Sequence, residues 1–505
     1  MTSRIQPATT YHRSTEYDRN AMQGHYLDWS DQPDVYKRYP GIRPLKLPAA
    51  ELTGEQNLWT LSNRRTMAAS MENVNLAVVG SFLRQACCLT ARVGRPGQDF
   101  YYRSVPSAGA LYPAEIYLAA SSVAGLESGL YHYDITGGNL IPLRQIGPAN
   151  LLDRAAAPGD TERLAASFLL TGIIYRSAWK YRSRAYRYVL LDAGHLLENM
   201  ILAARSLALD FSFGYDFNDR ELESFMGIDG RREVCLACFH VYGGKSPPAA
   251  APVTPVNGEN DIPTAAPVCL REVDYPEIEQ LHRAGIPPVP ADAGKPETRH
   301  ELGIEPRRYR AITRNGERTA AIPYPEIVFT RRSRRNFVNQ ELPETAFDSL
   351  LELPADVLRR SEIGDNNPEP PIRVGFFSGA VEHVPPGLYL LDPDQRRIGL
   401  VREGQRIREM AAVCLDQEWL SNSALLFLFM ADLDFLHHSR GPRGYRHAMM
   451  TAGRLGQIIH LSATALGLGC CGIGAFYDGE ARTLLGLRQN SALLYVTAVG
   501  PVRRL

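Results

Sequence analysis

The sequence has no excess of charge of either sign. Its 505 residues include 55 Lys and Arg against 55 Asp and Glu, so a surface that binds nucleic acid or an anionic membrane through net charge is not expected. Long apolar runs are also missing, because the most apolar stretches, ASFLLTGII and SALLFLFMA, are far shorter than a bilayer span. The first residues contain no apolar core of the kind that a secretory signal needs.

Cysteine is scarce as well. Eight cysteines in 505 residues lack the density and the spacing of a disulfide scaffold. We therefore expect a reduced, cytoplasmic protein, and its length predicts about two to four domains.

What the sequence does contain is an internal repeat. Residues 186–228 match residues 445–487 without a gap, at an offset of 259 (445 − 186). GLYHYD (129–134) and GLYLLD (387–392) match upstream in the same order. The period is too long for a solenoid, so the repeat indicates a duplicated domain. The identical pairs include Tyr186/Tyr445, Arg187/Arg446, Gly194/Gly453, Leu202/Leu461, Phe217/Phe476, Asp219/Asp478 and Gly227/Gly486.

Each half mixes short strands with a helix that is apolar nearly all round. This pattern predicts a buried helix in each half and an α+β fold. Between the halves lies a stretch rich in Pro, Ala and Gly, followed by DYPEIEQLHRAG, which predicts one docked helix. The expected parts are a leader (1–55), a first domain (56–248), a linker with the docked helix (249–320) and a second domain (321–505).

One basic cluster stands out from the balanced composition. Residues 330–337 read TRRSRRNF. Guanidinium groups beside a hydroxyl suit a phosphate, which they bind through bidentate, charge-assisted hydrogen bonds. Charge runs are also common on solvated surfaces, and composition alone favours that alternative. The candidate phosphate ligands are Arg331, Arg332, Ser333 and Arg335.

A strip of small residues is the second candidate feature. It reads PSAGALYP and begins with Pro106, Ser107, Ala108 and Gly109, whose small side chains would let a flat ligand lie against the backbone. Together with TRRSRRNF, KYRSRAYRYVLLDAGHLLEN and FYDGEARTLLGL, the strip resembles the FMN-dependent nitroreductase superfamily, and within it the SagB-type azoline dehydrogenases. The leader, with YHRSTEY and YLDWSDQPDVYKRYP, is similar to the same branch.

The resemblance implies both a fold and a cofactor. Members are typically homodimers with FMN at the subunit interface. The arginine motif and late basic residues of one protomer hold the phosphate, and the strip of the partner lies against the isoalloxazine ring. Here two protomers would be fused into a pseudo-dimer of two nitroreductase-like domains, each with a central antiparallel or mixed sheet surrounded by helices.

The resemblance also predicts a single FMN per chain, because the halves have lost different parts. The second half keeps the arginine cluster and ends in Arg503 and Arg504, which match the family's late phosphate-binding position, but it lacks the strip. The first half keeps the strip, whereas its copy of the cluster reads NRRTMAAS (63–70) and has lost the last arginine. One composite site would survive, with Gly472 and Gly474 marking a turn that passes near the flavin.

A third asymmetry concerns the predicted catalytic pair. Lys180 and Tyr181 match the Lys-Tyr pair that SagB-type enzymes use as acid and base, whereas the repeat has Ser439 and Arg440 at these positions. Oxidation by a flavin moves a hydride to N5 and a proton to a base. Without the resemblance, a surface lysine beside a tyrosine at the edge of the core would be the preferred interpretation.

The cysteine pairs are expected to be packing residues. Cys235 and Cys238 form a Cys-x-x-Cys in an apolar strand, where a spacing of three should point them to opposite faces. Cys470 and Cys471 would lie near the flavin, where a redox role is the alternative to packing. GLGCCG (467–472) fits Gly-x-Gly-x-x-Gly, but it follows a helix rather than a strand, so no dinucleotide-binding fingerprint is predicted.

The histidines do not indicate a metal site. His437 and His438 lack a third ligand at a familiar spacing, and no metal is predicted. His195 follows Gly194 in the expected buried helix, and we interpret it as a core histidine with satisfied hydrogen bonds.

Three functions follow as alternatives. The first is a SagB-type, FMN-dependent dehydrogenase or oxidase that oxidises an azoline-like group on a modified peptide, or another small molecule, in a biosynthetic pathway and passes electrons to O₂. The second is an NAD(P)H-dependent nitro or quinone reductase, which needs the FMN but not Lys180 and Tyr181. The third is a degenerate scaffold without catalysis, to which the lost motifs point.

The expected partners follow from the first function. They are a small-molecule or modified-peptide substrate and other biosynthetic enzymes, with neither nucleic acid nor a membrane among them. The fused chain is expected to be a monomeric pseudo-dimer or a higher homo-oligomer.

Overall fold

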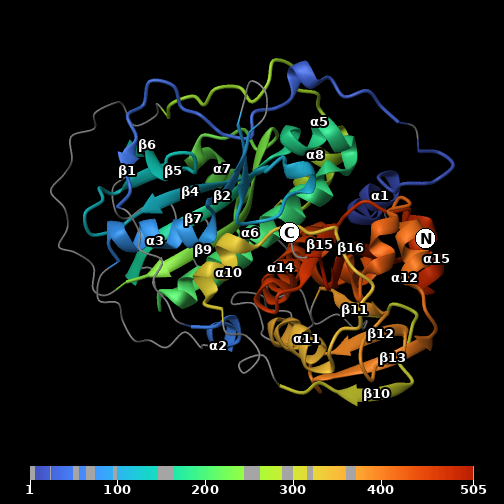
Figure 1. Ribbon diagram of the computed structural model, residues 1–505. Coiled ribbons are helices and arrows are strands. Elements are labelled where there is room, and N and C mark those ends of the chain that lie inside the picture. Colours follow the sequence, from blue (N-terminus) through green and yellow to red (C-terminus); the bar gives the residue numbers. More distant parts are fainter. Residues whose placement is uncertain are drawn as a thin grey trace.

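The chain folds into two α+β halves that lie side by side. The blue-to-green part forms one half and the yellow-to-red part the other, with the long helices α6 (Ala185–Ser206) and α14 (Gly444–Ala465) between them (Figure 1). The computed structural model describes residues 6–22, 24–48, 56–63, 74–94, 99–145, 163–243, 262–286, 300–314, 322–359 and 371–503.

Each half contains a seven-stranded antiparallel sheet. The strand orders, β1-β6-β5-β4-β7-β9-β8 and β10-β13-β12-β11-β14-β16-β15, correspond position by position. Of the predicted antiparallel or mixed sheets, the antiparallel form is found in both halves. The first sheet comprises β1 (Leu45–Lys46), β4 (Ala114–Ala120), β5 (Gly129–Asp134), β6 (Asn139–Gln145), β7 (Leu164–Ile173), β8 (Asp210–Gly214) and β9 (Glu233–Tyr242). The second comprises β10 (Arg308–Ala311), β11 (Arg373–Ser378), β12 (Gly387–Asp392), β13 (Arg397–Glu403), β14 (Leu425–Asp432), β15 (Gly469–Ile473) and β16 (Ser491–Gly500).

Helices surround the sheets, and a small hairpin of β2 (Leu89–Val93) and β3 (Phe100–Arg103) is added to the first half. The equivalent helices α7 (Asp219–Met226) and α15 (Asp478–Leu485) both end at a glycine with positive φ, Gly227 at 68° and Gly486 at 77°, a conformation that residues with a Cβ disfavour. The other α-helices are α1 (Pro7–Ser14), α2 (Leu58–Asn63), α3 (Leu76–Ala86), α5 (Ile174–Tyr181), α8 (Pro276–Ala284), α10 (Tyr324–Thr330), α11 (Glu344–Arg359), α12 (Ile407–Val413) and α13 (Leu433–Arg440).

The predicted buried helices are confirmed, and they pack on each other. In α6 every residue from Ala185 to Ala204 is buried. The helices approach closely at Gly194 and Gly453, where a Cβ on either glycine would collide with a carbonyl oxygen of the opposite helix. The largest apolar cluster contains side chains of both helices and both halves, so the halves share one core.

The two repeats exchange a helix near their beginnings. Helix α1 lies against the second half (Figure 1), where a 3.0 Å hydrogen bond links His12 Nδ1 to the Tyr445 hydroxyl. Helix α8 lies against the first half, where a 2.9 Å hydrogen bond links His282 Nδ1 to the Tyr186 hydroxyl. Since Tyr186 and Tyr445 are a matched pair of the repeat, α1 and α8 occupy corresponding places.

Buried ion pairs repeat the same symmetry. The Asp478 carboxylate accepts hydrogen bonds from Arg184 at 2.7 Å and Arg187 at 2.8 Å. The Asp219 carboxylate is paired with Arg443 and with Arg446, the latter at 2.9 Å. Strands β1 and β10 likewise take the same edge position in their sheets. We propose that the leader and the docked-helix segment belong to the duplicated unit; the domain limits 56–248 and 321–505 stay predictions.

One expectation about the core is wrong. Cys238 pairs with Leu169 and Cys235 with Thr171, two residues along β7, so both thiols lie on the same face of β9 and in the same apolar cluster. A β-bulge at Leu236 inserts one residue and shifts the alternation. The expected packing role is confirmed, since both side chains are buried.

Within the part of the chain that the structure describes, no helix combines the length and apolar character needed to cross a membrane. The cytoplasmic location stays a prediction.

Gly453→Ala should destabilise the protein. The added Cβ meets the Leu191 carbonyl, so α6 and α14 must separate, and overpacking of this kind costs about 1–3 kcal/mol. Urea and thermal denaturation of the full chain measure the loss. Gly479→Ala is the matched control, because its Cβ would have no neighbour closer than 3.9 Å. Equal stability of the two variants would contradict the close helix contact.

Candidate active site

Arg331 joins the second half to the small-residue strip of the first. It directly follows α10, which lies beside the first half (Figure 1). Its Nε donates to the Ser104 carbonyl at 2.7 Å and its Nη2 to the Arg103 carbonyl at 2.9 Å. Residues 103 and 104 lead into the strip at 106–109, so the arginine cluster and the strip lie next to each other as predicted for a composite site.

The charge of Arg331 is buried, and no carboxylate of the described residues is among its hydrogen-bond partners. Burial lowers the pKa of its guanidinium to about 10. Its Nη1 is buried, and none of the described residues accepts a hydrogen bond from it. A buried cation with an unused donor is stabilised when an anion binds. Ser333 and Arg335 beside it are exposed, so these three residues fit a phosphate group.

The other predicted phosphate ligands differ in their placement. Arg503 lies next to the cluster, since its carbonyl accepts from Asn336 Nδ2 at 3.0 Å. Arg332 donates from Nη2 to the Thr90 carbonyl at 2.8 Å. Arg504 lies outside the described residues, as do residues 64–73, which contain all but the first residue of the incomplete copy of the cluster (63–70).

The strip is half-exposed and has a strained backbone. Positive φ angles occur at Gly109 (65°) and at two residues with a Cβ, Ala110 (55°) and Tyr112 (45°), and such strain is found most often at functional sites. Arg176 Nη1 donates to the Tyr112 carbonyl at 3.0 Å and fixes one end. The exposed face of the strip can receive a flat ring.

Asp192, on α6, fixes the other end and was not among the predicted residues. Its carboxyl shares a hydrogen bond of 2.5 Å with Ser107 Oγ and accepts one from the Ala108 N–H at 3.3 Å. Burial raises the pKa of Asp192 to about 7. A signal was present in the sequence, because an acid inside an apolar helix is unusual and the repeat has Thr451 there.

Lys180 and Tyr181 end α5 beside the strip. A Cβ on Gly109 would lie 2.9 Å from the Tyr181 hydroxyl, so this hydroxyl reaches the strip. Lys180 Nζ lies 5.5 Å from the centre of the Tyr181 ring. Burial raises the pKa of Tyr181 above its usual value, against the opposing charge of Arg335. The pair, the strip and the arginine cluster are therefore neighbours.

The residue after this pair is strained in the first half only. Arg182 has φ 49° and ψ −138°, a conformation that costs energy for a residue with a Cβ. Its equivalent in the repeat is Gly441, with φ 60° and ψ −160°. The first half thus keeps an unfavourable turn next to Lys180 and Tyr181.

The two predicted glycines are close to the site, but one expectation about them is wrong. Gly472 lies inside β15 and not in a turn. A Cβ at this position would collide with the Tyr495 hydroxyl, which explains the need for glycine there. Gly474 follows the strand and packs against the Tyr188 ring, whose hydroxyl donates to the Gly474 carbonyl at 3.2 Å.

The predicted core role of His195 is confirmed. Its ring nitrogens are hydrogen-bonded to Gln457 Oε1 at 3.1 Å and to the Tyr495 hydroxyl at 3.0 Å. Burial lowers the pKa of His195 to about 3, so the imidazole is neutral. Because both partners belong to the second half, His195 ties the halves together beneath the site.

Comparison with known proteins decides the family. The profile of the nitroreductase family matches residues 68–245 and 389–501, more than half of the chain. The chain belongs to the nitroreductase family. A crystal structure of a nitroreductase-like protein from Anabaena variabilis matches it with a TM-score of 0.74 and 25% identity, over 99% of this chain and 100% of the other. Both halves thus have the nitroreductase fold.

Two curated relatives are similar to parts of this nitroreductase. The trifolitoxin-processing protein TfxB of Rhizobium leguminosarum bv. trifolii is 31% identical over 182 residues, 35% of this chain and 44% of TfxB. The microcin B17-processing protein McbC of Escherichia coli is 32% identical over 136 residues, 26% of this chain and 50% of McbC. The chain spans about half the length of these curated relatives.

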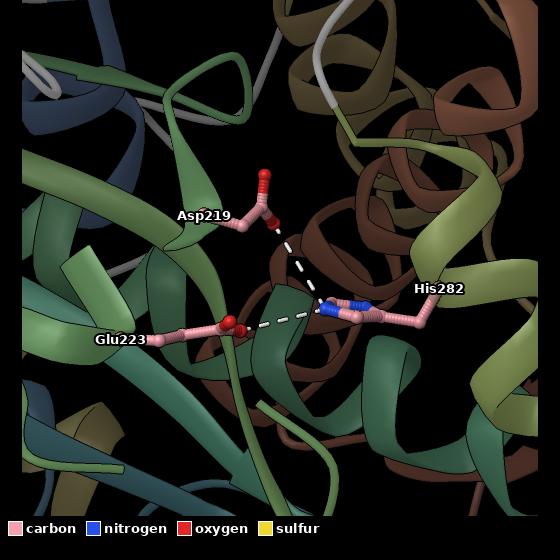
Figure 2. Close-up of side chains that lie close together, drawn as sticks. All are labelled: Asp219, Glu223 and His282. Atoms are coloured by element: carbon pink, nitrogen blue, oxygen red, sulfur yellow. Dashed lines mark ion pairs between the residues drawn. The ribbon is translucent and has the colours of Figure 1, made fainter. Parts of the chain in front are cut away.

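A second cluster of ionisable side chains lies outside this site. Asp219 and Glu223 of α7 point toward His282 of α8 (Figure 2), and one ligand atom from each lies within 4.8 Å of the others. Both oxygens of Asp219 are already paired with arginines, Arg443 and Arg446. Two cations thus balance this carboxylate, and the cluster needs no metal ion. The equivalent Asp478 cluster has Arg482 in place of Glu223.

Asp219→Asn should destabilise the fold without involving a metal. It leaves two buried arginines without their anion, and breaking such a pair costs about 3–5 kcal/mol. Thermal denaturation with and without EDTA measures both effects, and EDTA should change nothing. Glu223→Gln is the control, because it leaves the arginine pairs intact. A fall in melting temperature with EDTA, or an equal loss in both variants, would indicate a metal site instead.

Proposed function

We propose that this nitroreductase is an FMN-dependent oxidoreductase of the SagB type. It would dehydrogenate an azoline-like group of a modified peptide, or another small molecule, in a biosynthetic pathway. Lys180 and Tyr181 would act as its acid and base.

The contact of Arg331 with residues 103 and 104 supports this proposal most directly. Through this contact the arginine cluster of one half lies next to the strip of the other half, as a shared FMN site would require. The second half lacks a matching strip in its sequence, and the first half lacks the full arginine motif. One complete FMN site per chain follows.

The residues of this site fit FMN in their chemistry. Arg331, Ser333, Arg335 and Arg503 would hold the phosphate, with Arg332 supporting the loop through its bond to Thr90. The exposed face of the strip, Pro106 to Gly109, would receive the isoalloxazine ring, with Gly472 and Gly474 on the opposite half. When bound, FMN would supply a hydride acceptor at N5.

The proton released with the hydride would go to the neighbouring pair. The raised pKa of Tyr181 keeps its hydroxyl protonated at neutral pH, so it can donate a hydrogen bond and orient the substrate. Lys180 would then be the base. The strained turn at Arg182 would hold both side chains in place, since the repeat, which has a glycine there, has also lost the pair.

The relatives support the substrate class. TfxB and McbC are named for the processing of trifolitoxin and of microcin B17, and we extend processing of this kind to the present chain. Other enzymes of the same pathway would then be its partners. An NAD(P)H-dependent nitro or quinone reductase would use the same FMN site, but nothing in that function requires Lys180 and Tyr181.

The purified protein should contain about one FMN per chain, because only one arginine cluster is complete. Arg335→Ala should weaken FMN binding by about tenfold or more through loss of a charge-assisted bond. Flavin released on denaturation and fluorescence titration measure these effects. Arg334→Ala, an adjacent arginine outside the motif, is the control. Two FMN per chain would show that the incomplete site still binds.

Lys180→Ala should keep its FMN and lose turnover. Removal of a positioned base lowers rates by about 10²–10⁴-fold. Flavin content and oxidation of an azoline-containing peptide are measured on the same samples, with the exposed Lys46→Ala as control. Steady oxidation of NAD(P)H that Lys180→Ala leaves unchanged would instead favour the reductase.

A further inference from the structure

Asp192 is a buried acid whose hydrogen bonds all go to the strip. Its side chain lies on α6, and the residue is only 6% exposed. Oδ2 bonds to Ser107 Oγ at 2.5 Å, and Oδ1 accepts from the Ala108 N–H at 3.3 Å. Ser107 Oγ in turn accepts from the Tyr112 N–H at 2.9 Å. Asp192 therefore holds residues 107 and 108 directly and is linked to Tyr112 through Ser107.

The structure shows no ion-pair partner for this carboxyl in the part of the chain that it describes. Among the described residues Asp192 forms no ion pair; Arg103, at the end of β3, is the cation that acts on it through its charge, while Arg103 Nη2 donates to the Val35 carbonyl at 2.6 Å. The other ionisable groups that face it are the hydroxyls of Tyr181 on α5, Tyr495 on β16 and Tyr112 after the strip. Three phenols can donate hydrogen bonds, but they bring no positive charge.

The acid occurs only where the strip occurs. The repeat has Thr451 at the corresponding place in α14, although the two helices share their glycine, their arginine and their tyrosine at matched positions. A threonine is shorter and cannot ionise. An acid is thus present in the half that contains the strip and absent from the equivalent helix of the other half, although both helices pack in the same way.

We propose that Asp192 is a positioning residue that holds the strip in its FMN-binding conformation, and that it does so in its protonated form. This inference rests on the proposed FMN site. FMN that covers the exposed face of the strip removes the remaining water from the carboxyl, and an ionised acid without a cation then becomes unfavourable. FMN binding should therefore weaken as Asp192 loses its proton, which burial places near neutral pH.

The test compares FMN affinity of the apo full-length chain across about pH 6 to 9, measured by quenching of flavin fluorescence. Wild type should lose affinity above neutral pH, by up to about tenfold per pH unit. Asp192→Asn should bind FMN as the wild type does at low pH and show no such loss, because its amide donates to Ser107 Oγ and accepts from the Ala108 N–H. Asp192→Thr, the residue of the repeat, should bind more weakly at every pH.

A double-mutant cycle separates positioning from general damage to the core. Ser107→Ala should weaken FMN binding in the wild type but add little in the Asp192→Thr background, because both changes remove the same bond. Additive losses, or an Asp192→Asn variant with the pH dependence of the wild type, would overturn the proposal.

A second measurement does not depend on FMN. The pKa of Asp192 is raised in the folded state, so its contribution to stability is present below its unfolded value and is lost as the pH rises through about 7. The melting temperature of the apo wild type should fall relative to Asp192→Asn over that range. If the chain binds no FMN at all, the proposed function fails. If instead the melting temperatures of wild type and Asp192→Asn differ by the same amount at every pH, the proposal that Asp192 is protonated is wrong.

Discussion

The close contact of α6 and α14 at Gly194 and Gly453 is the constraint on which the rest of the molecule depends. The absence of a Cβ at both positions lets the backbones touch, and this distance sets the spacing between the two halves. At that spacing His195 reaches Gln457 and Tyr495 across the interface. The loop after α10 also comes close enough for Arg331 to bond to the opposite half. Helix packing and candidate site are therefore parts of one interface.

The two halves are alike in the residues that stabilise the fold and differ in the residues of the proposed active site. Both buried aspartates retain their two arginines, and both exchanged helices retain a histidine bonded to a tyrosine. By contrast, the repeat has Ser439 at the position of Lys180 and Thr451 at the position of Asp192. A second complete site would bring no benefit to stability, because the packing requires only the scaffold pairs. Duplication followed by unequal loss thus explains a symmetric frame around a one-sided site.

Much of the fold could be predicted from the sequence, because the repeat aligns without a gap and its apolar helix allows only a buried position. What failed depends on contacts that a linear pattern does not show. The bulge at Leu236 shifts one strand by a residue, which no spacing rule reveals. The correspondence of α1 and α8 rests on two short stretches around His12 and His282, too little to align. Asp192 was hidden because its partner in the strip is 85 positions away in the chain, although its polarity within an apolar helix marked it.

The exchanged helices have a consequence for the covalent connection between the halves. Helix α1 contacts the second half and α8 contacts the first, and α8 lies within the segment that connects the two halves. Two identical halves could also meet through their aspartate–arginine clusters, but they would lose contacts between unlike residues of α6 and α14, such as Arg454 with Glu198. Pairs of identical halves would contain either two strips or two arginine clusters, and never one of each. Fusion into a single chain gives every first half a second half at high local concentration, and so ensures that each particle is made of complementary halves.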